Sequence, residues 1–369
     1  MMERKTIGDI CIPLRKEIIK QGDLKDNGKY PVVNSGVTLY GYYNAFNNDG
    51  NAFTLASRGE YAGFITYLQD KFWAGGLCYP YRSKDESLYS TKFIYNFLKS
   101  RERYIMDTLV MRGGIPALNK ADVDKIQIPI PSLSEQTCIV NILDTFTASI
   151  ENLKQQITER HKQYEYYRDQ LLDLEGKDDN IVSFGDVCEM IKGDGVQKVD
   201  FVDEGIGCIH YGQIYTHYGS FTDTTNKYVS KEVFDKAKKA SKGDIIMTDT
   251  SENVEDICKS VAYLGEDDIA VSNHALIIKH NQNPKFLSYS TLTRSFFIQK
   301  RKYVVGVKVS GIKPNDLAKI KIFLPSIEEQ NRIVSILDTF EASIANLEAQ
   351  LELREKQYEY YRNKLLTFE

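Results

Sequence analysis

The sequence predicts an α+β protein in which two mixed α/β domains are joined by two long helices that pair as an antiparallel coiled coil. Three observations support this prediction. A 42-residue segment occurs twice, at 131–172 and 325–366, with 27 identical positions. Both copies carry a heptad pattern of apolar residues. A longer segment with mixed strand and helix patterns precedes each copy, so we expect pseudo-twofold symmetry.

Composition places the chain among ordinary globular proteins. Its 369 residues are 42% hydrophobic and 27% charged, which is enough for two domains with sizeable cores. It has no apolar run of 18 residues and no signal-peptide pattern at its start, so we expect a cytoplasmic protein. The six cysteines form no CxxC pair and the five histidines show no ligand spacing, so we expect reduced thiols and no metal.

Charge is distributed unevenly along the chain. The net charge is −4, but the segments 131–179 and 325–369 carry −5 and −4, whereas 1–130 carries +4 and 180–324 carries +1. Residues 269–315 contain no acidic residue at all. A local basic face matters more for phosphate binding than the molecular total, so a DNA partner for the two blocks stays possible.

The first block, 1–130, shows glycine-punctuated strands followed by helices. Strand patterns precede the turns in YPVVNSG (30–36) and FTLASRGEYAGFITY (53–67), and an aromatic-rich helix is expected at STKFIYNFLKS (90–100). A short helix and a strand close the block at NKADVDKIQIPIP (119–131).

The first long helix is expected within 131–175. Ser132 and Glu135 have the spacing of a capping box, directly after a proline, and no further Gly or Pro occurs until Gly176. Apolar residues recur in alternating steps of four and three, interrupted only by Arg160. A helix of about 40 residues is roughly 60 Å long.

The second block, 176–324, repeats the order of the first with different residues. GDVC (185–188) corresponds to GDIC (8–11), and IGCIHYG (206–212) corresponds to YPVVNSG (30–36). A strand–loop–strand pattern follows at GDIIMTDTSENVEDICKSVAY (243–263), then one helix at PKFLSYSTLTRSFF (284–297) and a closing helix and strand at KPNDLAKIKIFLP (313–325). The second long helix is expected within 325–369 and repeats the capping pattern at Ser326 and Glu329. Its line of apolar heptad residues, here called the seam, is interrupted by Arg354 as the first is by Arg160.

These motifs together resemble the specificity (S) subunit of type I DNA restriction–modification systems, over the whole chain. The resemblance is carried by IPIPSLSEQ (128–136) and IFLPSIEEQ (322–330), by the helix ends YYRDQLL and YYRNKLL, and by SRGEYAG (57–63). The order of variable block, central helix, variable block and distal helix is that of the family. The second block has TDTSENVED in place of SRGEYAG, so the arginine of the first block has no counterpart there.

The resemblance implies a non-catalytic subunit. Each block would be a target-recognition domain that reads one half of a bipartite site in double-stranded DNA. The helix pair would set the unread spacer and bind two methyltransferase subunits, which methylate adenine at N6, and restriction subunits would join for cleavage. S-adenosylmethionine, ATP and Mg would then bind the partner subunits, and this chain would hold no cofactor. A prokaryotic cytoplasmic location at the nucleoid follows from the same resemblance.

Candidate DNA contacts lie in the glycine turns of both blocks. An arginine on a turn can bond guanine bidentately, and amides suit adenine. The alternatives are a surface arginine paired with Glu60, turn chemistry for the polar residues, and packing for the tyrosines. The candidates in the turns are Asn34, Ser35, Ser57, Arg58, Tyr61, Tyr211 and Gln213.

Basic residues in both blocks are candidates for phosphate contacts. Arg112 lies beside two glycines of the first block, and the acid-free stretch of the second block supplies Lys300, Arg301, Lys302 and Lys308. The alternative is a solvated helix face.

The heptapeptide KQYEYYR occurs at 162–168 and again at 356–362. Its seam tyrosines are expected to pack between the helices. The off-seam residues Tyr166, Arg168, Tyr360 and Arg362 are the candidates for methyltransferase docking. Two other functions remain open: a coiled-coil scaffold that binds proteins at its ends, and a stand-alone DNA methyltransferase or nuclease. The second lacks an Asn/Asp-Pro-Pro-aromatic turn and a glycine-rich nucleotide loop.

Overall fold

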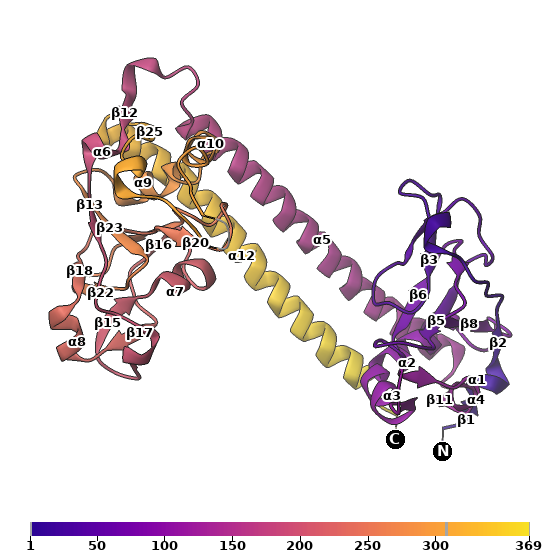
Figure 1. Cartoon of the computed structure of the whole chain (residues 1–369). Helices are drawn as coiled ribbons and strands as arrows, with labels where there is room; N and C mark the ends of the chain where they lie inside the picture. The colour runs from indigo at the N-terminus through magenta and orange to yellow at the C-terminus, as the bar shows by residue number, and fades with distance from the viewer. Residues whose placement is uncertain (1, 307–308, 369) are drawn as a thin grey trace. The chain divides into compact units, whose positions relative to one another are not determined.

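The computed structural model describes residues 2–306 and 309–368, which form two compact units (Figure 1). Unit 1 consists of Met1–Gln155 and Ala349–Glu369, and unit 2 of Gln156–Glu348. Two long helices, α5 (Leu133–Leu172) and α12 (Ile327–Leu365), each contribute a segment to both units. Their lengths of 40 and 39 residues confirm the two predicted helices.

The globular block of unit 1 is built from short strands and helices. They are β1 (Arg4–Thr6), α1 (Ile7–Ile10), β2 (Cys11–Pro13), the 3₁₀ helix η1 (Gln21–Asp23), β3 (Tyr30–Val33), β4 (Gly41–Tyr43), β5 (Ala52–Ala56), β6 (Ile65–Leu68), β7 (Trp73–Ala74), β8 (Cys78–Ser83), α2 (Thr91–Ser100), α3 (Glu102–Thr108), β9 (Val110–Met111), β10 (Ala117–Leu118), α4 (Lys120–Asp124) and β11 (Gln127–Pro129).

The main sheet of unit 1 has the order β2-β8-β5-β6 and is antiparallel throughout. Helix α2 packs on β5 and β6 and buries Phe93 and Phe97. The same core includes Ile139 and Leu143 of α5 and Leu366 just after α12. The block therefore shares one hydrophobic core with its helix segments, which is why the segments hold a fixed place within the unit.

The globular block of unit 2 follows the same order with additional strands. Its elements are the 3₁₀ helix η2 (Asp178–Asn180), β12 (Ile181–Ser183), α6 (Phe184–Val187), β13 (Cys188–Lys192), the 3₁₀ helix η3 (Lys198–Asp200), β14 (Phe201–Val202), β15 (Ile206–Ile209), α7 (Tyr211–Thr216), β16 (Phe221–Thr222), β17 (Lys227–Val229), α8 (Lys231–Lys236), β18 (Lys238–Ala240), β19 (Ile245–Thr248), β20 (Thr250–Ser251), β21 (Ser260–Tyr263), β22 (Ile269–Val271), β23 (Ala275–His280), α9 (Pro284–Ser290), α10 (Arg294–Lys300), β24 (Ser310–Gly311), α11 (Pro314–Leu317) and β25 (Lys321–Phe323).

The sheets of unit 2 match those of unit 1 strand by strand. The order β13-β23-β19-β21 corresponds to β2-β8-β5-β6, with β16 added at the edge. The parallel pair β15–β22 corresponds to β3–β7, and the pair β12–β25 to β1–β11. These matches confirm the α+β class and the internal duplication. The predicted single helix at 284–297 is wrong, because the segment forms two helices. Helix α9 ends at Ser290 with Thr291 as its C-cap, and Thr293 then caps the start of α10 by accepting from the Phe296 N–H.

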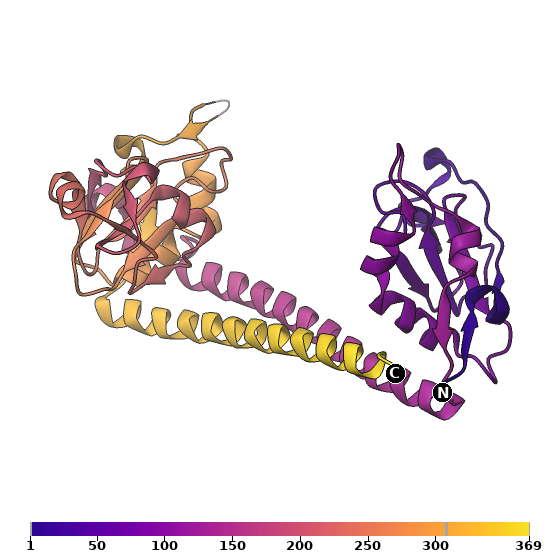
Figure 2. The ribbon, with the colours of Figure 1, turned by 90° about the horizontal axis from the view of Figure 1, so that it is seen from below.

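The segments of α5 and α12 run side by side and antiparallel within each unit (Figures 1 and 2). In unit 1 the rings of Phe146 and Tyr361 stack at 5.4 Å, while Lys154 pairs with Glu355. In unit 2 the rings of Tyr167 and Phe340 stack at the same 5.4 Å. In unit 2, His161 also lies 3.9 Å from Glu348. In both units rising numbers on α5 therefore meet falling numbers on α12, as antiparallel packing requires.

The arginines that interrupt the heptad seam have a place in the packing. The Arg160 guanidinium lies 5.9 Å from the Phe340 ring centroid, and the Arg354 guanidinium lies 5.7 Å from that of Phe146. Each arginine therefore covers the face of a seam aromatic with a cation, which is favourable because the ring face is electron-rich.

The two long helices begin differently despite identical spacing. Ser132 and Glu135 bond each other's backbone N–H, which confirms the first capping box. At the second start Ser326 accepts from the Glu329 N–H at 3.3 Å, but the Glu329 carboxylate pairs with Arg332 at 2.6 Å instead of returning to Ser326. The second reciprocal capping box is therefore wrong, because Arg332 stands where the first copy has a cysteine.

Candidate nucleic-acid interface

The β5–β6 loop, residues 57–64, presents Arg58 to solvent. The loop is closed at its base by the Gly63 N–H donating to Ala56 O at 2.8 Å and the Ala56 N–H donating to Phe64 O at 2.9 Å. Gly63 has φ +93°, a conformation that favours glycine. In the part of the chain that the structure describes, no ion pair or hydrogen bond engages the Arg58 guanidinium, not even with Glu60. Its donors are therefore available to a ligand.

The two other candidates on this loop, Ser57 and Tyr61, differ in exposure. Ser57 is buried: its N–H donates to Leu77 O and its carbonyl accepts from the Leu118 N–H, both at 2.9 Å. Tyr61 is exposed on the same loop. Ser57 thus positions the loop, whereas Tyr61 lies beside Arg58 on the accessible side.

The β9–β10 hairpin, residues 110–118, lies against this loop. Arg58 forms a backbone bridge with Ala117, and the Gly59 N–H donates to Pro116 O at 2.9 Å. Arg112 at the turn of the hairpin is exposed and lies 3.8 Å from Asp107. The Arg112 guanidinium also donates to Met106 O at 3.3 Å. Both interactions are exposed, and an ion pair this long is weak, so a phosphate can replace them.

The turn after β3 uses its polar side chains internally. Asn34 Oδ1 accepts from the Leu77 N–H at 2.8 Å, which braces the strand that supports the Arg58 loop. Ser35 is half-buried beside it. The Asn34 amide nitrogen is the part of this turn that could still meet a base edge.

The β19–β21 loop of unit 2, residues 249–259, is built on the same frame. The Cys258 N–H donates to Thr248 O at 3.0 Å, and Cys258 has φ +64° at the position of Gly63. Thr250 pairs with Gly311, as Arg58 bridges Ala117. Thr250 therefore occupies the register position of Arg58, and the loop that follows it carries Glu252 and Asn253 instead of an arginine.

The turn after β15 is occupied by α7. Gln213 Oε1 accepts from the His210 N–H at 2.8 Å and its Nε2 donates to Asn226, so the side chain caps the helix and has no free end. Tyr211 is half-buried and lines a hollow of about 460 Å³ with Thr250, Asn253 and His274. Of the two candidates on this turn, only Tyr211 faces an open surface.

The prediction that Lys300 contacts phosphate is wrong, because its side chain is buried. It is only 4% exposed, and its ammonium donates to Glu255 O and Ile257 O, while burial lowers its pKa. We remove it from the candidate interface, because it braces the β19–β21 loop from beneath. Arg301 and Lys302 are exposed in the turn after α10. Lys308 lies outside the described residues.

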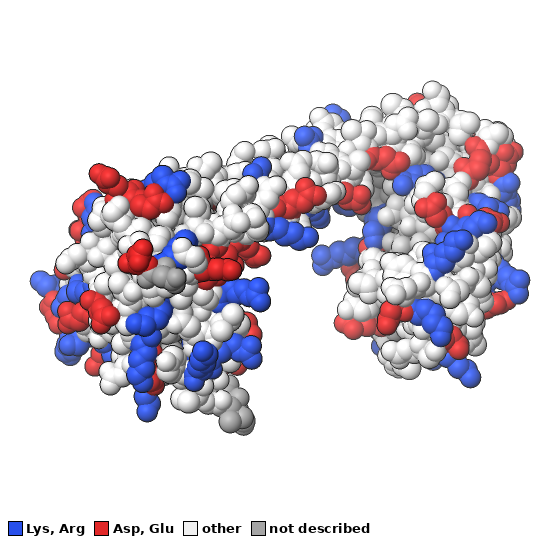
Figure 3. Space-filling view, turned by 90° about the horizontal axis from the view of Figure 1, so that it is seen from above, with Lys and Arg blue, Asp and Glu red and all other residues white. Residues whose placement is uncertain are grey.

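The acid-free stretch is less basic in space than in sequence. Lys279 pairs with Asp244 at 2.6 Å, and Lys285 pairs with Asp338 at 2.8 Å. Acidic residues from distant segments thus neutralise part of it. Figure 3 shows basic side chains spread over the visible surface of unit 2, with acidic side chains among them.

Each repeat of KQYEYYR has two exposed tyrosines, and its first tyrosine, on the seam, is buried at Tyr164 and half-buried at Tyr358. Tyr164 is buried on the seam, whereas Tyr166 and Tyr360 are 58% and 59% exposed. Tyr166 meets Tyr167 edge to face at 5.4 Å, and Tyr360 meets Tyr361 in the same way at 5.3 Å. The two units therefore expose the same pair of tyrosines in nearly identical geometry.

The arginines of KQYEYYR turn inward, unlike the tyrosines. Arg168 donates to Asp169 at 2.9 Å, and its side chain is only 13% exposed. Arg362 is 25% exposed and lies 3.8 Å from Glu359. Of the four candidate docking residues, Tyr166 and Tyr360 offer the larger accessible surfaces.

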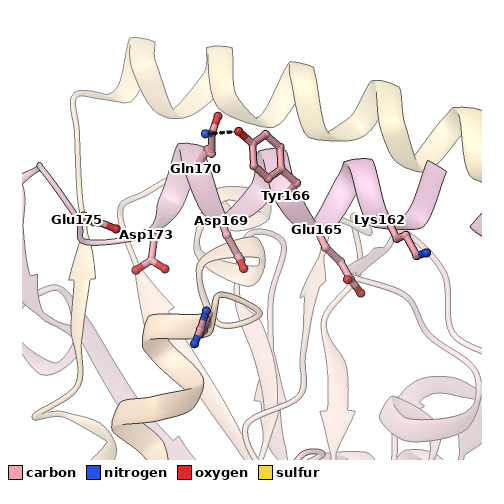
Figure 4. A pocket seen from close by; sticks show the side chains of 8 residues that line it. Lys162, Glu165, Tyr166, Asp169, Gln170, Asp173 and Glu175 are labelled. Carbon is pink, nitrogen blue, oxygen red and sulfur yellow. Dashed lines mark hydrogen bonds between the residues drawn. The ribbon is translucent and has the colours of Figure 1, made fainter. Parts of the chain in front are cut away.

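A groove runs along α5 beside Tyr166 in unit 2 (Figure 4). Its lining includes Lys162, Glu165, Asp169, Asp173 and Arg294, and Tyr166 accepts a hydrogen bond from Gln170 at 2.7 Å. The corresponding positions of α12 in unit 1 include Asn363 and Lys364 where α5 has Asp169 and Gln170. The two repeated faces therefore share the tyrosines but differ in charge.

Two buried glutamines were not among the sequence candidates. Gln136 accepts from the Ser90 N–H at 2.8 Å and donates to Leu88 O and Pro131 O. Gln330 accepts from the Asn283 N–H at 3.0 Å and donates to Pro325 O. Each one joins the start of a long helix to the start of the helix in its block. The sequence signal that could have identified these two glutamines is their occurrence at the same position in both copies of PSxxEQ.

No nucleophile or metal centre stands out in the described residues. Burial raises the pKa of five cysteine thiols to about 12, so these thiols are protonated at neutral pH. Residues 2–306 and 309–368 contain no cluster of His, Cys, Asp or Glu suited to a metal ion. Nor does any helix among them have the length and apolar character of a membrane span.

Comparison with known proteins identifies relatives over the whole chain. The family model described as "Type I restriction modification DNA specificity domain" matches residues 1–160 and 177–354. A putative type I restriction enzyme specificity subunit of Haemophilus influenzae is 29% identical, covering 96% of this chain and 95% of the relative. A type I specificity subunit of Escherichia coli is 28% identical, with coverage of 96% and 90%.

Solved structures support the same fold. The crystal structure of a type I restriction–modification S subunit from M. genitalium matches with a TM-score of 0.65 at 17% identity, covering 100% of this chain and 97% of that one. A chain from a study of complex assembly in the type I system matches with a TM-score of 0.60, also at 17% identity, with coverage of 99% and 97%.

Proposed function

This chain belongs to the type I restriction–modification DNA specificity family, and we propose that each of its two globular blocks reads one half of a bipartite site in double-stranded DNA. The observation that carries the proposal is the shared frame of the β5–β6 and β19–β21 loops. Both loops leave equivalent strands and pair with equivalent hairpins, yet Arg58 in one stands where Thr250 stands in the other. A fixed frame with different side chains suits the reading of two different base sequences.

The remaining candidates support a division between positioning and reading. In this proposal Arg58, Tyr61 and Asn34 of unit 1, and Tyr211 of unit 2, contact bases. We propose that Arg112, Arg301 and Lys302 contact phosphates, which give affinity without sequence information. Lys308 stays in the proposal from its sequence position alone.

The helix pair is proposed to set the spacer and to bind two methyltransferase subunits. Tyr166 and Tyr360 support this, since tyrosines are favoured at protein interfaces and the two exposed pairs are alike in geometry. Two like surfaces suit two copies of one partner, and restriction subunits would join that complex. Arg168 and Arg362 would act beneath the tyrosines by holding the helix ends in place.

The chain itself is proposed to be non-catalytic. Adenine N6 methylation, with S-adenosylmethionine, would belong to the methyltransferase subunits, and cleavage with ATP and Mg to the restriction subunits. The protonated state of the buried thiols and the structural use of Gln213 and Lys300 are consistent with a binding role.

The proposal is tested by replacing Arg58 with alanine in the complex with the methyltransferase subunit. If Arg58 bonds guanine bidentately, affinity for the site should fall about 5- to 150-fold, and discrimination should relax at one position of one half-site. The matched control is Arg103→Ala, since the Arg103 side chain is 96% exposed on α3 of the same unit. Equal effects of the two variants on methylated-site sequencing and on binding would refute the reading role of Arg58.

A further inference from the structure

The exposed tyrosines of the two KQYEYYR repeats have different neighbours one helical turn further on. In unit 2 the Gln170 amide donates to the Tyr166 hydroxyl at 2.7 Å. In unit 1 the ammonium of Lys364, the equivalent residue of α12, lies 5.8 Å from the Tyr360 ring centroid. Residues four apart in a helix lie on the same face, so each neighbour belongs to the accessible surface around its tyrosine. A neutral amide in one repeat is therefore replaced by a cation in the other.

Two acidic residues on the unit 2 face are absent from the unit 1 face. Asp169 and Asp173 line the groove of about 660 Å³ shown in Figure 4. Asn363 and Thr367 stand at the equivalent positions of the second repeat, and both residues are exposed. The two aspartates give −2 in unit 2 and Lys364 gives +1 in unit 1, so the two faces differ by three charges.

Other charges near the two faces are alike or are held internally. KQYEYYR is identical in both repeats, so its own charges are the same on the two faces. Arg294 at the start of α10 is matched in unit 1 by Arg101 at the start of α3. The ammonium of Lys177 donates to Gln170 O and Leu171 O, so this cation is held at the end of α5. The difference between the faces therefore comes from the three positions that follow each KQYEYYR.

The net charge of the helices indicates the charge of a suitable partner. The segments 131–179 and 325–369 carry −5 and −4. A subunit that docks along them gains from basic residues in its contact surface, because complementary charges favour association and like charges oppose it. Two copies of one subunit present the same contact surface to both faces. They therefore cannot match equally well two faces that differ by three charges.

We propose that the unit 2 face binds its methyltransferase subunit more tightly than the unit 1 face does, so that the two subunits join the chain in a fixed order. Tyr166 and Tyr360 supply the contact that the two faces share. Basic residues of the subunit at unit 2 lie beside Asp169 and Asp173, whereas at unit 1 the same residues meet Lys364. This inference rests on the proposed function and adds to it that the two docking sites are unequal.

The test titrates the full chain with its purified methyltransferase subunit, without DNA, and resolves the two binding steps by isothermal titration calorimetry. At about 50 mM salt the two intrinsic dissociation constants should differ about tenfold, since each of the three charge differences contributes about twofold. The ratio should fall toward one at about 1 M salt, because exposed charges are then screened within about 3 Å.

An exchange of residues on α5 identifies the tighter face. The combined variant gives unit 2 the residues of the second repeat by Asp169→Asn, Gln170→Lys and Asp173→Thr. It should weaken the tighter step about tenfold, so that the two steps become equal.

The reciprocal exchange and a matched control complete the set. The reciprocal variant, which should strengthen the weaker step by a similar factor, combines Asn363→Asp, Lys364→Gln and Thr367→Asp. The control removes three charges at exposed positions in the globular block of unit 2, by Asp203→Asn, Glu204→Gln and Asp235→Asn. It should leave the ratio of the two constants unchanged, because these positions lie outside both repeats.

The inference is wrong if the two intrinsic constants are equal in the wild-type chain, and the proposed function then still stands. It is also wrong if the α5 exchange strengthens binding, since the unit 1 face is then the tighter one. If the control equalises the two steps as the exchange does, overall charge and not the repeated faces sets the difference. If the chain binds no methyltransferase subunit at all, the proposed function itself fails.

Discussion

Unit 1 and unit 2 use the same frame but attach the globular block to the long helices in different ways. In unit 2 the Tyr289 hydroxyl lies 2.7 Å from Asp338 and 3.0 Å from Glu341 on α12. Glu341 also accepts from Tyr164 of α5 at 3.2 Å and from Ser220 at 3.0 Å. Burial, and then the hydrogen bond to Asp338, raise the pKa of Tyr289. One carboxylate thus joins four segments.

Unit 1 has no such network at the corresponding positions. Asn96 occupies the place of Tyr289, and its amide nitrogen is buried without a hydrogen-bond partner among the described residues. Thr147 occupies the place of Glu341 and donates only to Leu143 O within its own helix. Unit 1 instead adds an aromatic contact to the shared core: Phe368 meets the rings of Phe93 and Phe97 at 6.2 and 6.4 Å.

One ion pair is common to both attachments. Lys92 lies 3.3 Å from Asp144 in unit 1, and Lys285 lies 2.8 Å from Asp338 in unit 2. The difference teaches that the duplicated helices have changed where they face their diverged blocks, as at Thr147 and Glu341. They have stayed alike where they face each other, as at the stacked Phe146–Tyr361 and Phe340–Tyr167 pairs.

The largest expected effect comes from Glu341→Ala. It removes the acceptor of three hydroxyl groups in a part-buried site, so unit 2 should lose about 3 kcal/mol of stability. Thr147→Ala is the matched control in unit 1 and should change stability by no more than about 0.5 kcal/mol. Urea unfolding of the full chain measures both. Similar losses for the two variants would show that the attachments are equivalent after all.

A smaller effect is expected from pH. All five histidines lie in unit 2, and burial lowers the pKa of His280 and of His210. A group whose folded pKa lies below its unfolded value of 6.5 binds fewer protons when folded. Its contribution to stability is therefore complete above pH 6.5 and is lost as the pH falls below that value.

Hydrogen exchange between pH 7.5 and 5.5 checks this prediction. Unit 2 should lose protection as the pH falls, whereas unit 1 should not, since it contains no histidine. His280 Nδ1 accepts from the Gln282 N–H at 3.1 Å, so protonation would also break that bond. His280→Gln should flatten the pH dependence of unit 2. A parallel loss of protection in both units would contradict the assignment.

The smallest expected effect is a difference in stability loss between substitutions at the two helix starts. Glu135→Ala removes half of a reciprocal capping box and should cost about 1 kcal/mol. Glu329→Ala removes only an exposed ion pair with Arg332 and should cost at most about 0.5 kcal/mol. The midpoints of thermal unfolding give the comparison. A larger loss for Glu329→Ala would mean that its carboxylate supports the helix start in another way.

Local patterns determined the long helices and the order of elements. The heptad spacing, the prolines before Ser132 and Ser326 and the glycine turns depend on residues close in sequence, whose propensities and periodicity act in any context. The exposed position of Arg58 could be predicted for the same reason, because Gly59 and Gly63, which follow it, form a surface turn.

Tertiary structure alone decided which polar residues are free to bind. Lys300 reads as a surface cation, yet it is buried because Glu255 and Ile257, 45 and 43 residues away, offer their carbonyls to it. Arg168 is off the seam, yet its side chain is only 13% exposed, in a hollow that Ile257 and Phe297 also line. The sequence by itself determined a duplicated frame carrying two unlike blocks. Which side chains face outward depended on long-range partners, since hydrogen bonds formed across the fold have no signature in sequence spacing.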